Sequence, residues 1–262
     1  MNARPKKSFG QHFLHEKRYI ERIVSSISPK PGDAVVEIGP GEGALTLPLL
    51  AAAGRMTAIE LDTDLIPDLQ ARADAVGELR IVHSDVLKVD FTTLAHELGV
   101  ERVRIAGNLP YYISSPILFH CVDHAAAIQD MHFMLQKEVV DRMAAEPGSK
   151  VYGRLSVMLQ LACRVEPLFT VPPGAFRPPP KVDSAVVRLV PLTPEQRHGA
   201  DPDRVHAIVK AAFAQRRKTL SNALRQLMDA QAIEAAGIDP KARAETLDPL
   251  DFVRLAKIAP AG

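Results

Sequence analysis

The 262-residue sequence has no tryptophan, two cysteines and a net charge of only +1. Cys121 and Cys163 lie far apart and neither belongs to a C-x-x-C pair, which argues against a zinc site and favours a reducing compartment. No apolar run approaches the ~20 residues needed to cross a bilayer, and the N-terminus lacks the apolar segment of a secretion signal. We therefore expect a cytoplasmic protein without a metal or a membrane segment.

The composition is that of a globular protein, with 47% hydrophobic and 24% charged residues. This length suits one domain of ordinary size and a smaller one. Residues 191–202 are polar and rich in proline, so we predict a domain over residues 1–195 and a small helical domain over 196–262. We expect a monomer. Helices are predicted over residues 16–27, 114–122 and 137–145, from Val205 onward, and around residues 220–227.

A glycine loop follows the first predicted strand, which spans residues 34–38. Residues 39–44 read Gly-Pro-Gly-Glu-Gly-Ala and are followed by a helical stretch to Ala53. Strand, glycine loop and helix in this order are typical of a nucleotide-binding α/β unit, in which the backbone of Gly39 and Gly41 can approach a ligand closely. The same residues fit the dinucleotide pattern, so the loop alone does not separate NAD from other adenosine cofactors. A glycine turn without a ligand also stays possible.

Carboxylates follow the next two predicted strands. Glu60 ends the strand over residues 56–60, about 20 residues after the glycine loop, where a Rossmann-type fold holds the ribose hydroxyls. Asp85 follows the strand over residues 79–82 and could accept a hydrogen bond from an adenine amino group. Its alternative role is to cap a turn or a helix.

Residues 108–112 (Asn-Leu-Pro-Tyr-Tyr) follow the apolar run 103–107 and suit a planar base that carries an amino group. The exocyclic nitrogen of adenine is a poor nucleophile, because its lone pair is spread into the ring. The Asn108 side-chain oxygen and the Leu109 carbonyl could hold its hydrogens, with Pro110 fixing the backbone, and Tyr111 could stack on a flipped base. Alternatively, these residues form an ordinary strand exit with the tyrosine in the core.

These polar groups stand at the carboxyl ends of successive strands, the edge where open α/β sheets bind ligands. Segments 37–43, 60–62, 84–85 and 108–111 resemble the motifs of class I S-adenosyl-L-methionine-dependent methyltransferases that act on adenine N6. The resemblance implies a Rossmann-like α/β fold with a mostly parallel seven-stranded sheet and a small C-terminal helical domain.

Four longer segments, 8–14, 108–116, 176–184 and 213–220, are similar to the ribosomal RNA adenine dimethyltransferases, specifically the small-subunit group. His12 and Tyr112 stand where asparagine is frequent. The resemblance implies that S-adenosyl-L-methionine is held by His12, Leu14, Gly39, Gly41, Glu60, Asp85 and Asn108. It implies a catalytic site of Asn108, Leu109, Pro110, Tyr111 and Phe176, in which Tyr111 and Phe176 sandwich the base. The implied substrate is a pair of adjacent adenines in a hairpin loop near the 3′ end of 16S rRNA, dimethylated at N6 during ribosome biogenesis.

Two further segments have alternative interpretations. Three prolines stiffen residues 176–181, which could close the base pocket or simply connect two strands. Between Arg204 and Arg225 the sequence has basic residues and no acidic ones, and Arg216, Arg217 and Lys218 are our candidate RNA contacts. A solvated helical face is the alternative.

Two other functions stay open at this point. One is adenine methylation of large-subunit rRNA or of DNA. The other is a ribosome-assembly binding factor with dispensable catalysis.

Overall fold

The computed structural model describes residues 12–197, 199, 201–215 and 217–258. The chain forms two compact units, one of residues 1–140 and 166–191 and one of residues 141–165 and 192–262. The second unit therefore takes in residues 141–165, which lie within the predicted first domain. The reason is packing, because Tyr152 and Val157 belong to the buried cluster of the C-terminal helices. Whether residues 1–195 and 196–262 are separate domains stays a prediction.

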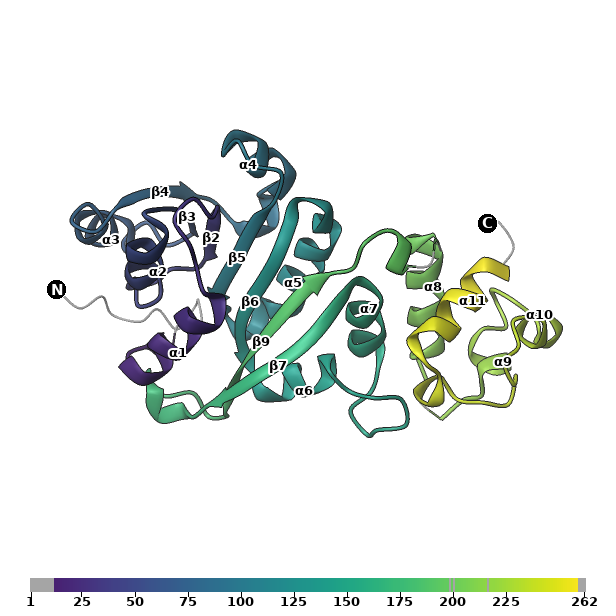
Figure 1. Ribbon diagram of the computed structural model, residues 1–262. Helices are drawn as coiled ribbons and strands as arrows, with labels where there is room; N and C mark the ends of the chain where they lie inside the picture. The colour runs from purple at the N-terminus through teal and green to yellow at the C-terminus, as the bar shows by residue number, and fades with distance from the viewer. Residues whose placement is uncertain (1–11, 198, 200, 216, 259–262) are drawn as a thin grey trace. The chain divides into compact units, whose positions relative to one another are not determined.

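A seven-stranded sheet with the order β4-β3-β2-β5-β6-β9-β7 forms the centre of the first unit (Figure 1). Strands β4, β3, β2, β5 and β6 pair in parallel, and β9 is antiparallel to β6. This confirms the predicted mostly parallel sheet. The strands are β2 (Val35–Ile38), β3 (Arg55–Glu60), β4 (Glu78–His83), β5 (Val103–Asn108), β6 (Ile128–Gln136), β7 (Cys163–Val171) and β9 (Ser184–Pro191).

The helices of the first unit pack against the sheet, and the order of the strands places a binding crevice. They are α1 (Lys17–Ile27), α2 (Thr46–Ala53), α3 (Ile66–Ala73), α4 (Phe91–Glu97), α5 (Ser114–Asp123) and α6 (Lys137–Met143). Apolar residues of α1, α2 and α3 share one buried cluster with side chains of the strands. The chain runs from β2 outward to β4 and then returns to β5 beside β2. Such a reversal opens a crevice at the carboxyl ends of β2 and β5.

Local sequence explains where these helices begin and end. The predicted helix over residues 16–27 is confirmed as α1, with Ile23 and Ile27 buried. It ends at Ser28, whose φ of 49° and N–H bond to the Val24 carbonyl close the last turn. Helix α4 begins after Asp90, whose side chain accepts from the Thr93 N–H at 2.8 Å.

Two short strands that we did not predict hold the N-terminal segment. Strand β1 (Phe13–Leu14) pairs antiparallel with β8 (Phe176–Arg177), with Leu14 opposite Phe176. The His15 N–H adds a bond of 3.0 Å to the Ala175 carbonyl. Residues 12–14 therefore lie against the proline-bearing segment, although the two are far apart in the sequence. The rest of the predicted 8–14 motif lies outside the described residues.

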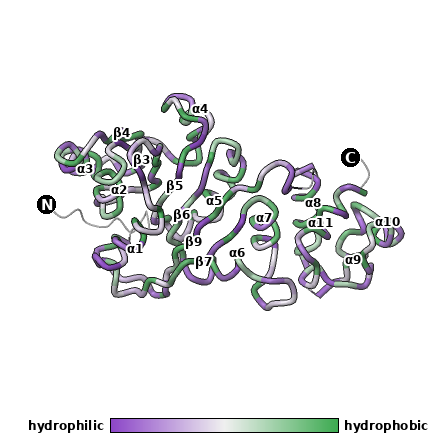
Figure 2. The backbone as a smooth tube through the Cα atoms, viewed as in Figure 1, coloured by the Kyte–Doolittle hydropathy of each residue, from purple (hydrophilic) through white to green (hydrophobic). Residues whose placement is uncertain are grey.

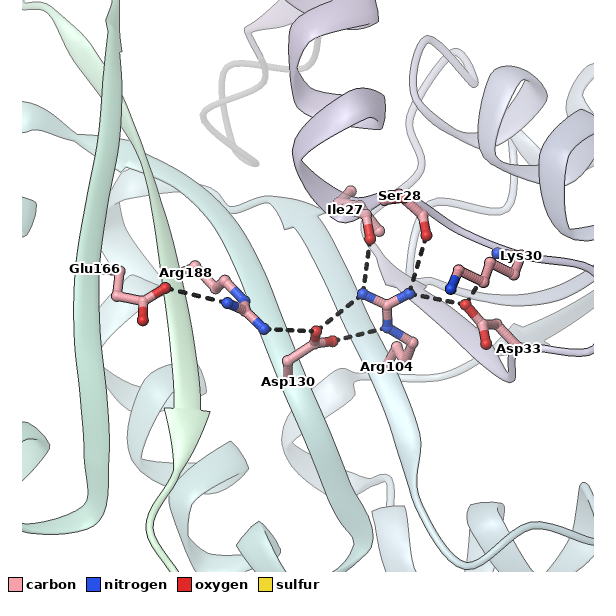
Figure 3. A network of polar contacts seen from close by, with 8 residues as sticks. All are labelled: Ile27, Ser28, Lys30, Asp33, Arg104, Asp130, Glu166 and Arg188. Atoms are coloured by element: carbon pink, nitrogen blue, oxygen red, sulfur yellow. Dashed lines mark hydrogen bonds and ion pairs between the residues drawn. The ribbon is translucent and has the colours of Figure 1, made fainter.

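A buried ion network ties α1 to the sheet at the end opposite the crevice (Figure 3). Arg104, near the start of β5, forms a bidentate pair with Asp130 at 3.0 and 2.9 Å and bonds Asp33 at 2.8 Å. It also donates to the Ile27 carbonyl at the end of α1 at 2.7 Å. Arg188 approaches the same Asp130 carboxylate at 3.7 Å. The network fixes the C-terminal end of α1, the helix that directly follows β1.

The second unit is helical, with its core around Leu220, Phe252 and Leu255. Figure 2 shows hydrophobic and hydrophilic residues alternating along its helices, as one buried and one exposed face require. The predicted helix at 220–227 is shorter than expected, since α9 ends at Ala223, and α10 and α11 were not predicted. The helices are α7 (Arg154–Ala162), α8 (Pro202–Ala212), α9 (Leu220–Ala223), α10 (Ala230–Ala235) and α11 (Pro249–Ile258). Within the described ranges, none of the helices is long and apolar enough to span a membrane.

Candidate functional site

A cavity lies at the carboxyl edge of the sheet, where the strand order reverses. Its walls come from the glycine loop after β2, the ends of β3, β4 and β5, and strand β1. The lining includes His12, Leu14, Gly39, Gly41, Glu60, Asp85, Asn108, Leu109, Pro110 and Tyr111. The fold therefore brings together every predicted site residue of the first unit except Phe176.

The glycine loop requires glycine for two reasons. Gly39 and Gly41 have φ values of 67° and 56°, in the left-handed region that other residues avoid. A Cβ on Gly41 would also lie 3.0 Å from the Phe13 ring. The loop can therefore pass close under strand β1, and its backbone faces the cavity.

Glu60 holds the loop and keeps acceptor capacity for a ligand. Its Oε2 accepts from the Gly41 N–H at 3.2 Å and its Oε1 from the Asp62 N–H at 2.8 Å. Burial raises the pKa of Glu60, and these backbone N–H bonds oppose the rise. A carboxylate offers about four lone-pair sites, so roughly two remain for hydroxyl groups.

Asp85 serves a structural role and still lines the cavity. Its Oδ1 accepts from the Leu87 N–H at 3.0 Å and so caps the short turn that follows β4. The cap that we considered as an alternative is therefore present. It does not exclude ligand binding, because the second carboxylate oxygen can accept independently.

Asn108 is oriented by the N-terminal segment. Its side-chain nitrogen donates to the His12 carbonyl at 3.0 Å. Because a carbonyl only accepts, this bond identifies the nitrogen of the amide and leaves Oδ1 as the acceptor on the other side. Leu109 is buried, with its N–H bonded to the Met134 carbonyl at 3.1 Å, and Pro110 has a φ of −58°. The backbone therefore leaves β5 along a fixed path.

Tyr111 lies against His12 at the side of the cavity. Its hydroxyl bonds Ser184 Oγ at 2.7 Å, and burial raises its pKa. The His12 ring stacks on the Tyr111 ring, with centroids 5.6 Å apart and planes 28° apart. His12 Nδ1 donates to the Pro178 carbonyl at 2.7 Å, since a carbonyl cannot donate. His12 thus links β1, the Asn-Leu-Pro-Tyr element and the proline segment.

The remaining predicted residues lie elsewhere. Phe176 is 2% exposed, packs in the core with Leu14 and is not among the residues that line the cavity. Arg217 and Lys218 are exposed in the second unit, and Arg216 lies outside the described residues.

Among the cavity residues that were not predicted, Glu37 and Tyr112 stand out. Glu37 is fully buried in β2, and its Oε2 has no hydrogen-bond partner among the described residues. Burial raises its pKa to about 7, against the opposing effect of the Thr46 hydroxyl and with a further rise from the Glu60 charge. The signal in the sequence was an acid inside an apolar strand. Tyr112 lines the mouth of the cavity and is 62% exposed.

Charge distinguishes the ligands that this cavity can hold. Five carboxyl residues line it, and the described part of its lining contains no Lys or Arg. An acidic lining favours a cationic ligand and disfavours the pyrophosphate of a dinucleotide. No group of three or more His, Cys, Asp or Glu suited to a metal ion occurs in the part of the chain that is described. The five residues are Glu37, Glu42, Glu60, Asp62 and Asp85.

Known proteins align with this chain over almost its whole length. A model of the ribosomal RNA adenine dimethylase family matches residues 2–260. A protein of Xanthomonas oryzae pv. oryzae called ribosomal RNA small subunit methyltransferase A is 60% identical over 260 residues, which are 99% of this chain and 98% of the relative. Its namesake in Xanthomonas campestris pv. campestris is 60% identical over 257 residues, with 98% and 97% covered.

Solved structures extend this similarity to the fold. A dimethyladenosine transferase from Plasmodium falciparum is 26% identical, with a TM-score of 0.80 over 93% of this chain and 96% of its own. The 23S rRNA methyltransferase ErmE is 27% identical, with a TM-score of 0.74 over 94% of this chain and 98% of its own.

Proposed function

Because the chain belongs to the ribosomal RNA adenine dimethylase family, we propose that it methylates adenine N6 atoms of small-subunit ribosomal RNA. The substrate is a pair of adjacent adenines in a hairpin loop near the 3′ end of 16S rRNA in the 30S subunit, each dimethylated during ribosome biogenesis in the cytoplasm. The 60% identity to small-subunit methyltransferases supports this target over large-subunit RNA, for which the similar structure is only 27% identical.

The acidic cavity is the observation that carries the choice of cofactor. S-adenosyl-L-methionine supplies an activated methyl group on a positively charged sulfonium, and the lining contains carboxyl residues without Lys or Arg. Glu60 retains acceptor sites for ribose hydroxyls, and the second oxygen of Asp85 for the adenine amino group. Gly39, Gly41, His12 and Leu14 would enclose the cofactor between the glycine loop and β1.

Asn108 and Leu109 prepare the target nitrogen. The Asn108 Oδ1 atom and the Leu109 carbonyl each accept one hydrogen of the adenine N6 amine, which localises its lone pair toward the methyl donor. Pro110 fixes the direction of the Leu109 carbonyl through its φ of −58°. Asn108 can perform this task because its nitrogen is already held by His12. The protein thus acts by positioning and electrostatics, and the amine loses its proton only after the attack.

Tyr111 provides a stacking face for the flipped base, an interaction of roughly 1–3 kcal/mol. The second face, which we assign to Phe176, requires a movement. Phe176 is buried in the core, and exposing such a side chain costs about 1.5–3 kcal/mol. RNA binding must therefore offset this cost. A base that stacks on the face of Tyr111 covered by His12 must also displace the His12 ring, while the His12 carbonyl stays bonded to Asn108.

RNA docking uses the basic stretch of the second unit. Arg217 and Lys218 are exposed and can bind phosphates through release of counterions. We extend this role to Arg216 from its place in the sequence. The protein would act on the subunit as a monomer, without a metal.

The test is transfer of labelled methyl from S-adenosyl-L-methionine to small ribosomal subunits that lack the modification, mapped by primer extension. We expect dimethyladenines at the paired 3′-end positions. Asn108→Ala should lower kcat by roughly 10²–10³-fold, the effect of removing one preorganised hydrogen bond to a reacting group. Gln129→Ala, at an exposed position outside the cavity lining, is the control. Transfer to large-subunit RNA or DNA instead would overturn the substrate, and an active Asn108→Ala would overturn the catalytic role.

A further inference from the structure

Tyr112 presents an unusually free aromatic ring beside the cavity. At 62% it is the most exposed of the large hydrophobic side chains in the described part of the chain. No ring contact, cation contact or hydrogen bond involves its side chain among the described residues. Single exposed apolar side chains are common on protein surfaces, so exposure alone indicates no function. The place of Tyr112 in the lining of the cavity is what points to a ligand.

Both the hydroxyl and the ring of the neighbouring Tyr111 already have partners. Its hydroxyl bonds Ser184 and its ring stacks on His12. Tyr112 is thus the aromatic surface that an incoming unpaired base meets first in this conformation. The two tyrosines both line the cavity, and their Cα atoms are ~3.8 Å apart because they are consecutive.

The backbone holds Tyr112 in a fixed place. It sits in the turn Tyr111–Ile113, between Pro110 and helix α5. The Ile113 N–H donates to the Pro110 carbonyl at 3.2 Å, and Ser114 Oγ donates to the Tyr111 carbonyl at 3.2 Å. Because the backbone is fixed before binding, only the two side-chain torsions of Tyr112 lose freedom when a ligand arrives.

Flipping a base creates the ligand that this platform fits. When one nucleotide leaves the stack and enters a pocket, its neighbour loses a stacking partner outside the pocket. Base stacking on aromatic side chains is tolerant of sequence, because every base has a π-face. We propose that Tyr112 stacks on the nucleotide adjacent to the target adenine and so positions it on the enzyme. This inference rests on the proposed function and extends the same site.

In the proposed substrate the adjacent nucleotide is itself a target. Tyr112 would then hold one adenine of the pair while the other is methylated. Its loss should weaken RNA binding without affecting the methyl donor, since Glu60, Asp85 and the glycine loop are unchanged. Tyr112 is therefore a positioning residue for RNA and not a catalytic residue.

The first arm of the test is kinetic, with unmodified small subunits as substrate and with Tyr112→Ala, Tyr112→Phe and Tyr112→Leu. We expect Tyr112→Ala to raise the KM for subunits roughly 5- to 150-fold, the range of one lost base stack. Tyr112→Phe should stay within about twofold of wild type, and Tyr112→Leu should resemble Tyr112→Ala, because stacking needs a π-face. The Kd for S-adenosyl-L-methionine should not change in any variant. Val76→Ala, at a 40% exposed position outside the cavity lining, is the control.

The second arm is independent of methyl transfer. A hairpin RNA carries the fluorescent base 2-aminopurine next to the target position, where stacking on Tyr112 quenches its emission. We expect quenching with wild type and Tyr112→Phe, and its loss with Tyr112→Ala. A quenched flanking base in Tyr112→Ala, an unchanged KM in that variant, or a KM in Tyr112→Leu equal to wild type would overturn the inference. If wild type transfers no methyl but shows the Tyr112-dependent quenching, the proposed reaction fails and the stacking role stands.

Discussion

Replacing Glu37 by glutamine tests whether the cavity contains a carboxyl group that titrates near neutral pH. Glu37→Gln keeps the size of the side chain and removes its charge at every pH. Glu37 is fully buried with its Oε2 unpaired, and burial raises its pKa from 4.5 to about 7. Above pH 7 the wild-type protein must therefore hold a buried negative charge, whereas the variant holds none.

The size and sign of the effect follow from the two pKa values. Because the pKa of Glu37 is raised in the folded state, its contribution to the free energy of unfolding is fully present below pH 4.5 and is lost as the pH rises to about 7. The difference of about 2.5 units corresponds to about 3 kcal/mol at 1.36 kcal/mol per unit. Near pH 4.5 the free energies of unfolding of Glu37→Gln and wild type should differ only by a constant offset. Between pH 4.5 and 7 the variant should become steadily more stable relative to wild type. Above pH 7 this relative gain should stay at about 3 kcal/mol.

Urea unfolding of the cofactor-free protein at several pH values between 5 and 8 measures this difference. Circular dichroism is the suitable signal, because the chain has no tryptophan. Glu101→Gln, at an exposed position, is the control for the substitution itself. An equal stability difference for Glu37→Gln at pH 5 and pH 8 would refute the reasoning, because Glu37 would then not titrate in that interval.

Two further substitutions test the supports of the site. Arg104→Met should lower the free energy of unfolding by about 3–5 kcal/mol, because it leaves the buried Asp130 without its bidentate partner. Its control, Arg80→Met, breaks an exposed pair with Glu97 and should cost at most about 1 kcal/mol. Gly107→Ala places a Cβ 2.7 Å from a main-chain oxygen, the Ile38 carbonyl, so we expect a loss of about 1–3 kcal/mol and weaker methyl transfer. Gly174→Ala, with open space around it, should leave both unchanged in the same urea and transfer assays.

The ends of the parallel strands and the cavity edge could be predicted because local sequence determines where each strand ends. Each parallel strand is an apolar run that ends in a loop, and the carboxyl ends of parallel strands meet at one edge. The sheet topology therefore brings Glu60, Asp85 and Asn108 together without any contact between their side chains being needed. Predicted and observed strands agree there within one or two residues, as for β3, predicted at 56–60 and found at Arg55–Glu60.

The contacts of the N-terminal segment could not be predicted in the same way. Strands β1 and β8 contain two residues each, too few for a periodic pattern, and their pairing depends on which segments lie nearby in the folded chain. The position of Phe176 follows from that pairing. A phenylalanine in a proline-rich segment suits a base pocket and a core equally well, and the structure places it in the core.

The charge of the cavity connects the buried Glu37 to the proposed reaction. A sulfonium loses its positive charge when it gives up its methyl group, so the acidic lining would attract the proposed methyl donor more strongly than the demethylated product. An ionised Glu37 increases this difference, and a protonated Glu37 reduces it. Because the bound cation itself favours the ionised form, donor binding and loss of the Glu37 proton are linked. The buried carboxyl thus costs stability in the free protein, and it would favour exchange of the demethylated product for the proposed methyl donor, which gives a physical reason for an acid inside an apolar strand.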